Sequence, residues 1–216
     1  MKPFVTHTGI AAPLLRRNID TDAIIPSREM KRVSKRGLGE GLFAGWRYTL
    51  PGSRELNPSF VLNRPEYAGA SILLALDNFG CGSSREHAVW ALAEYGVRAV
   101  IASGFGAIFH TNCIRNGILP VRLDEISITA LAEQVQRDPQ SNPVTIDLQT
   151  CLIQCGDLLW PFSLDESARH QLLNGLDPIA LTLQHRRAID VYEQARRKQR
   201  TWVYAPLEDS VEGVPL

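Results

Sequence analysis

Residues 70–137 alternate between short apolar runs and longer stretches with helical spacing, and this alternation limits the possible fold more than any other feature. Apolar runs of this length, without polar residues between them, are typical of strands buried on both faces of a parallel sheet. The expected strands are 72–76, 98–102 and 118–121, and the expected helices run from Ser83 or Ser84 to about Tyr95, from 105 to 115 and from 124 to 137. The sequence therefore predicts an α/β protein with a central parallel sheet.

The remainder of the chain is less regular. Residues 4–25 predict short strands and turns, with a strand-like run after Asp22, and residues 27–66 predict a long flexible loop because they lack periodicity and are rich in glycine, proline and arginine. A helical C-terminal extension is expected over about 164–200. The expected elements after residue 140 are strands at 144–148, 151–153 and 158–162 and helices at 165–173 and 178–197. We expect residues 1–216 to form a single domain.

Composition excludes several classes of protein. Lysine plus arginine equals aspartate plus glutamate at 23 each, so the chain lacks the basic charge of a nucleic-acid-binding protein. No apolar stretch reaches the roughly 18–20 residues of a membrane helix, and the N-terminus lacks the apolar core of a signal peptide. We therefore expect a cytoplasmic protein with reduced cysteines. The spacing of Cys151 and Cys155 and the scattered histidines match no metal signature, so no metal site is expected on this chain.

Residues 78–88 (NFGCGSSREHA) place two glycines, two adjacent serines and an arginine where a strand is expected to become a helix. The first turn of a helix has unpaired N–H groups and the positive end of the helix dipole, so it binds anions well. Arg85 adds a planar group matched to a carboxylate or phosphate. Ser83 and Glu86 also have the spacing of a capping box, so either serine could instead cap the helix.

Nucleotide binding and serine hydrolysis fit this segment poorly. Arg85 replaces the third glycine of the dinucleotide fingerprint, and no acid follows at the expected distance. The Gly-x-Ser-x-Gly elbow of hydrolases is absent, and His87 would point along the helix, away from the serines. An arginine at a helix N-terminus is unfavourable unless something negative lies nearby. Glu86, a bound carboxylate or an aspartate at 20 or 22 could meet that need, and the local sequence leaves these choices open.

Three segments occur in the order found in one protein family. They are residues 18–26 (NIDTDAIIP), 78–88 and 103–120 (SGFGAIFHTNCIRNGILP). The chain resembles the mobile domain of the aconitase superfamily and is most similar to the small subunits of bacterial 3-isopropylmalate dehydratases. The resemblance implies a three-layer β/β/α swivelling domain. It also implies a hydro-lyase that isomerises 2-isopropylmalate to 3-isopropylmalate in leucine biosynthesis. The implied partner is a large subunit that carries a [4Fe-4S] cluster.

The resemblance also assigns roles to residues. Ser83 matches the catalytic serine that takes and returns a proton next to a carboxylate, and Ser84 matches its neighbour in the active site. Arg85 matches the arginine that binds a substrate carboxylate, and Asp22 matches a supporting acid. A further substrate-binding arginine of the superfamily has no clear counterpart.

The loop after Pro26 is where family members differ by substrate, which makes Arg28 and Met30 candidate substrate contacts. Two alternatives remain. The chain could serve a related hydratase acting on citraconate, homoaconitate or dimethylmalate, or it could be a non-catalytic carboxylate-binding module.

Overall fold

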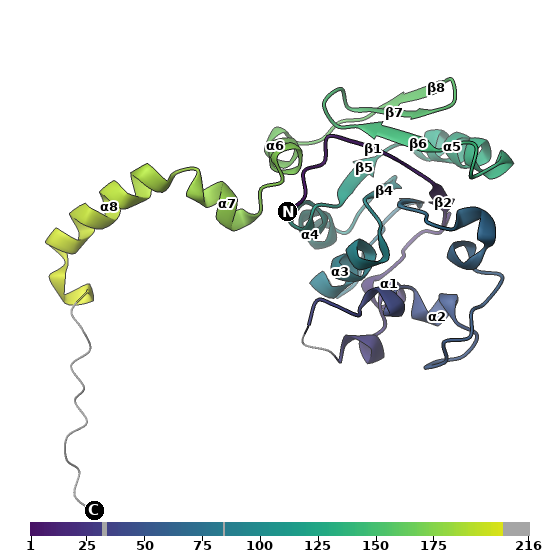
Figure 1. Cartoon of the computed structure of the whole chain (residues 1–216), viewed down its shortest axis with the longest axis horizontal. Coiled ribbons are helices and arrows are strands. Elements are labelled where there is room, and N and C mark those ends of the chain that lie inside the picture. The colour runs from purple at the N-terminus through teal and green to yellow at the C-terminus, as the bar shows by residue number, and fades with distance from the viewer. Residues whose placement is uncertain (32–33, 84, 205–216) are drawn as a thin grey trace, which may run out of the picture. The chain divides into compact units, whose positions relative to one another are not determined.

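Two four-stranded sheets form the body of residues 1–177, and the computed structural model describes residues 1–31, 34–83 and 85–204 of the chain. The parallel sheet has the order β2 (Ala11–Pro13), β3 (Ile72–Leu74), β4 (Ala99–Ala102) and β5 (Leu119–Arg122). The antiparallel sheet has the order β1 (Thr6–Gly9), β6 (Val144–Asp147), β7 (Leu152–Cys155) and β8 (Leu158–Pro161). Figure 1 shows the antiparallel sheet on one side of the parallel sheet and helices α3 (Glu86–Tyr95) and α4 (Ala107–Asn116) on the other. This arrangement confirms the predicted three-layer β/β/α class.

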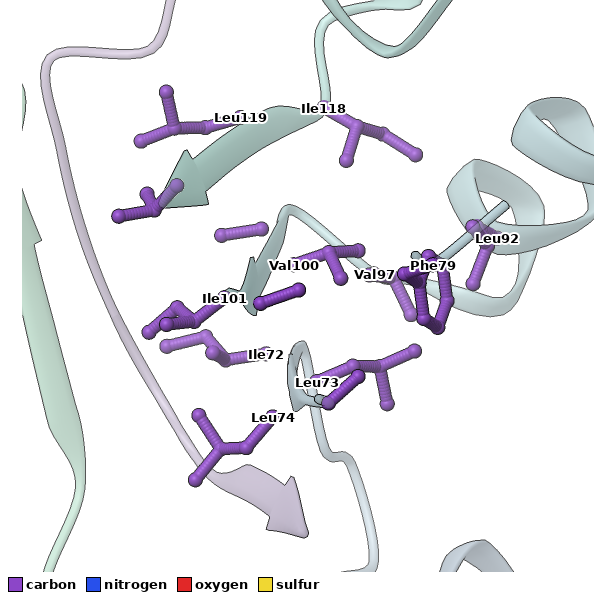
Figure 2. Packing of buried hydrophobic residues seen from close by; sticks show 14 of the residues in the cluster. Ile72, Leu73, Leu74, Phe79, Leu92, Val97, Val100, Ile101, Ile118 and Leu119 are labelled. Carbon is purple, nitrogen blue, oxygen red and sulfur yellow. The ribbon is translucent and has the colours of Figure 1, made fainter. Parts of the chain in front are cut away.

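The parallel sheet is buried because its strands carry apolar side chains on both faces. Leu73 and Val100 point toward Leu92 of α3 in Figure 2, and all three are fully buried. Leu74 and Ile101 point to the opposite face of the sheet and are also fully buried. Helices α3 and α4 each connect two neighbouring parallel strands, and right-handed crossovers place such helices on the same face.

The remaining helices complete this unit. Helix α5 (Glu125–Arg137) contacts strands of both sheets, and its first turn is capped by Asp124, which accepts the N–H of Ser127 at 2.9 Å. Helix α6 (Glu166–Asn174) is capped in the same way by Asp165. Among the described residues, every helix is too short or too polar to cross a bilayer.

The predicted start of α3 was wrong. The helix begins at Glu86, and its N-cap is Arg85, which makes no side-chain capping bond. Ser83 therefore does not form the expected capping box, and Ser84 lies outside the described residues. The helix begins later than predicted because of the backbone conformation of the preceding residues. Gly80 and Gly82 adopt positive φ values of 74° and 90°, so the chain is still turning where the pattern predicted a helix.

Two other local predictions need correction. The strand-like run after Asp22 is a helix, α1 (Thr21–Ile24), because the carboxylate of Asp20 accepts the N–H of Ala23 at 2.6 Å and caps it. The helix expected over 178–197 is divided at Gln184 and His185 into two. These are α7 (Pro178–Leu183) and α8 (Arg186–Gln199), which belong to a second unit, 178–216.

Residues 27–66, for which a flexible loop was predicted, contain much local structure. Leu38, Leu42 and Phe43 are fully buried in the core. The backbone N–H of Phe43 donates to the carbonyl of Ile24 at 2.7 Å, which brings the two ends of residues 25–42 together. The short elements here are α2 (Ala44–Arg47) and 3₁₀ turns at Ser27–Met30, Gly39–Gly41, Val61–Asn63 and Pro65–Tyr67.

Candidate functional site

The three sequence motifs meet at the carboxyl ends of β2, β3 and β4, which are neighbours in the parallel sheet. The N–H of Thr21 donates to the carbonyl of Cys81 at 2.9 Å, and that of Gly80 donates to Ile19 at 2.7 Å. The third motif is bonded to the second through Gly106, whose N–H donates to the carbonyl of Phe79 at 2.9 Å. Ligand sites in open α/β sheets lie at this edge. The turn carrying the candidate serines is therefore fixed by backbone bonds to both other motifs.

Two glycines make this close approach possible. A Cβ on Gly80 would overlap the buried ring of Phe109, and the positive φ of Gly80 would strain any other residue. A Cβ on Gly106 would lie 2.5 Å from the carbonyl oxygen of Gly80, where no side chain can move aside. The glycines are thus required by the contact between the second and third motifs.

Ser83 follows this turn and is exposed. Because α3 begins only at Glu86, Ser83 is not engaged as a helix cap. Its hydroxyl is therefore accessible to a ligand approaching the carboxyl edge of the sheet. Ser84, the other candidate alcohol, is outside the part of the chain that the structure describes.

Arg85 lies between the turn and α3, and its charge is partly compensated by Asp22. Nη1 of Arg85 is 3.3 Å from Oδ1 of Asp22, and the arginine side chain remains 35% exposed. Glu86 instead accepts a hydrogen bond from Nδ2 of Asn116 at 2.8 Å. Of these two carboxylates of the protein, Asp22 rather than Glu86 therefore contacts Arg85. Guanidinium has five N–H donors, so the contact with Asp22 leaves donors for a ligand carboxylate.

Arg28 and Met30, the two candidate substrate contacts after Pro26, have different neighbours. Sδ of Met30 is 3.9 Å from Nη1 of Arg85, so Met30 presents an apolar group beside the guanidinium. Nε of Arg28 instead lies 3.5 Å from the carboxylate of Glu29. The structure therefore brings Asp22 and Met30 to Arg85, whereas Arg28 pairs with its neighbour.

The sequence did not single out Cys81, which lies inside the turn next to the candidate serines. The side chain is partly buried, and burial together with the charge of Asp20 raises the pKa of its thiol. The thiol is thus held in its neutral form beside the site. In the sequence, the position of Cys81 between Gly80 and Gly82 was the feature that could have indicated its place beside the candidate site.

The cysteines are not paired, and Cys113 and Cys155 are buried. Within the described residues, no group of three or more histidine, cysteine, aspartate or glutamate side chains is placed to hold a metal ion. The described histidine, cysteine, aspartate and glutamate side chains therefore do not fit an iron–sulfur cluster.

Comparison with known proteins gives consistent results. Residues 1–126 match the model of the aconitase C-terminal domain, and residues 179–205 match that of the C-terminal domain of the 3-isopropylmalate dehydratase small subunit. The 3-isopropylmalate dehydratase small subunit of Cupriavidus necator is 58% identical over 94% of this chain and 99% of its own length. That of Acidothermus cellulolyticus is 51% identical over 91% of this chain and 95% of its own length.

A solved structure extends the comparison to the fold. The crystal structure of 3-isopropylmalate dehydratase from Methanocaldococcus jannaschii is 26% identical, with a TM-score of 0.63, and covers 88% of this chain and 99% of that one. The sequence comparisons and the structural comparison therefore indicate the same family over nearly the whole length of this chain. The chain belongs to the family of 3-isopropylmalate dehydratase small subunits, within the aconitase C-terminal domain family.

Proposed function

We propose that this chain supplies a proton-transferring serine, Ser83, and a carboxylate-binding arginine, Arg85, to the isomerisation of 2-isopropylmalate to 3-isopropylmalate. The observation that carries the proposal is the exposed Ser83 on a glycine turn beside Arg85, whose guanidinium is oriented by Asp22. The names of its relatives support a dehydration, and the rehydration that follows is what the family resemblance implies. Leucine biosynthesis is the pathway that the family resemblance implies.

Arg85 would hold one carboxylate of the substrate, and Ser83 would remove the proton from the carbon next to a carboxylate. The same hydroxyl would return a proton when water adds back in the other orientation. Asp22 would keep the guanidinium facing the substrate. Met30, beside Arg85, would contact the apolar part of the substrate.

A serine acts as a base only if its alkoxide is stabilised. The positive end of a helix contributes at most about 2 kcal/mol, and each well-placed hydrogen-bond donor contributes about 2.7–4 kcal/mol. Backbone N–H groups of the turn are candidates for these donors. That of Gly80 is excluded, because it already donates to the carbonyl of Ile19. Exclusion of water by a covering partner would strengthen the remaining interactions.

The resemblance places a [4Fe-4S] cluster on a separate large subunit, where it would supply the Lewis acid for the leaving hydroxyl. The described residues of this chain offer no ligand set for such a cluster. The proposed site is therefore shared between two chains, and this chain contributes the groups that bind a carboxylate and move a proton.

The test is reconstitution with the cluster-bearing large subunit. We expect this chain alone to be inactive and the complex to dehydrate 2-isopropylmalate. Ser83→Ala should lower kcat of the complex by about 10²–10⁴-fold, the usual contribution of a general acid–base. Ser167→Ala, which changes another exposed serine, is the matched control.

Two outcomes would reject the proposal. Turnover by the isolated chain would contradict a shared site, and full turnover by Ser83→Ala in the complex would remove Ser83 from its role. A substrate panel with citraconate, homoaconitate and dimethylmalate identifies the acid that the complex prefers. Tight binding of 2-isopropylmalate to the chain alone would instead favour a non-catalytic binding module.

A further inference from the structure

On either side of residues 32 and 33, the described residues contact helix α3 in the same order along both stretches of chain. Met30 meets Arg85, the residue just before the first turn of α3. Farther along the segment that carries Met30, Nζ of Lys35 lies 4.5 Å from the ring centroid of Trp90, in the middle of the helix. Residue 31 and residues 34–36 are exposed, so burial contributes little to fixing their positions.

The strongest of these contacts is made by Glu94 in the last turn of α3. Its Oε1 accepts the N–H of Gly37 at 2.6 Å, and its Oε2 accepts those of Leu38 at 2.5 Å and Gly39 at 2.8 Å. Gly37 is left-handed, with φ of 84°, and Leu38 is right-handed, with φ of −82°. Successive N–H groups in such an alternation form a concave binding site for an anion. Here the anion is a side chain of the protein itself.

The backbone around this contact fits closely. A Cβ on Gly39 would lie 3.1 Å from the backbone nitrogen of Tyr95, so a larger residue would require the segment and the helix to move apart by a few tenths of an ångström. The neighbouring Leu38 is fully buried. Nη1 of Arg47 donates to the carbonyl of Gly39 at 3.1 Å. Residues 37–39 therefore bond to both a carboxylate and a guanidinium.

The geometry makes this attachment important for Met30. Arg85 and Glu94 are nine residues apart, about 14 Å along a helix. The eight steps from Met30 to Leu38 could span up to about 27 Å if fully extended. The stretch from Met30 to Leu38 is therefore longer than the distance that it must span. The position of Met30 thus depends on where residues 37–39 are fixed.

We propose that Glu94 is a positioning residue that fixes the Met30 segment along α3 and so sets the affinity and selectivity for the apolar group of the substrate. The inference rests on the proposed function, since it takes Arg85 as the carboxylate site. Glu94 lies at the other end of α3 from Arg85 and contacts residues 37–39. Its loss should therefore weaken substrate binding and leave the proton transfer by Ser83 intact.

The attachment can be tested without any assay of activity. Glu94→Gln removes the negative charge and keeps the size, and Glu133→Gln, at an exposed position of α5, is the matched control. We expect limited trypsin digestion after Lys35 and Arg36 to become about tenfold faster in Glu94→Gln, because charge-assisted hydrogen bonds are lost. Amide exchange of residues 34–39 should rise, whereas that of residues 86–93 should not. Digestion and exchange equal to those of the control would overturn the proposal.

Kinetics of the reconstituted enzyme test the effect on the substrate. For Glu94→Gln we expect KM for 2-isopropylmalate to rise about tenfold with kcat within about twofold, a pattern typical of lost uniform binding. The preference for 2-isopropylmalate over the smaller 2-methylmalate should decrease. Glu94→Asp, which keeps the charge, should give intermediate values. An unchanged KM, or a fall in kcat alone, would overturn the inference.

These outcomes are separable from failure of the proposed function. An inactive wild-type complex would reject the function, while the digestion and exchange measurements would still decide whether Glu94 fixes the segment. An active wild-type complex whose KM is unaffected by Glu94→Gln would reject only the inference.

Discussion

Replacement of Gly80 by alanine should destabilise the protein through two separable effects. Gly80 has φ of 74°, and a left-handed conformation costs a residue with a Cβ about 1–2 kcal/mol. The new methyl would also overlap the ring of Phe109, which is 1% exposed and lies in a packed core. Overpacking of this kind costs about 1–3 kcal/mol. The expected loss in the free energy of unfolding is therefore about 2–5 kcal/mol.

Gly69 provides the control for the backbone effect alone. Its φ is 75°, and nothing lies within 4 Å of the position of its Cβ. Gly69→Ala should therefore lose only about 1–2 kcal/mol. Urea unfolding at neutral pH measures both variants, with the slope of each transition compared to that of the wild type. Equal destabilisation of the two variants would refute the argument that the contact with Phe109 requires a glycine at position 80.

Two further predictions concern stability. Asp20→Ala removes the cap that accepts the N–H of Ala23 and should cost about 1 kcal/mol in urea unfolding, whereas Asp20→Asn should cost clearly less; equal losses would argue against capping. Burial, and then the charge of Arg122, lowers the pKa of His110 from its ordinary 6.5. The unfolded chain therefore binds this proton more readily than the folded protein does. The contribution of His110 to the free energy of unfolding is fully present above pH 6.5 and is lost as the pH falls through the lowered pKa. His110→Gln should lose less stability than the wild type between about pH 7.5 and pH 5.5, and an identical pH profile would contradict this.

The sequence predicted the central sheet well because its strands carry a signal that little else produces. Continuous apolar runs such as 72–74 and 99–102 can be satisfied only by burial on both faces. Local capping patterns were less reliable. The spacing of Ser83 and Glu86 predicted a capping box, but the positive φ of two preceding glycines delays the helix. Short apolar runs after Asp22 were assigned to a strand, whereas a single cap at Asp20 makes them helical.

The residues of the candidate site could be named from the sequence where they lie in contiguous motifs. Ser83, Arg85 and Asp22 each stand in a motif, and strand order brings the motifs together. Glu94 could not be found in this way, because it contacts backbone N–H groups more than 50 residues away and these groups have no side-chain signature. Glycines at 37 and 39 were visible, but they indicated flexibility rather than an anion-binding turn.

The short distance between Ile24 and Phe43 has a practical consequence for changing specificity. Because the backbone bond between them closes residues 25–42 at one point, this stretch enters and leaves the core at almost the same place. A stretch of different length or composition from another family member can therefore be joined at these two points, provided that it replaces the buried side chains of Ile25, Leu38 and Leu42. In the proposed function, Ser83 and Arg85 lie outside this stretch and Met30 lies inside it, so proton transfer and substrate choice would reside on separate segments of one chain.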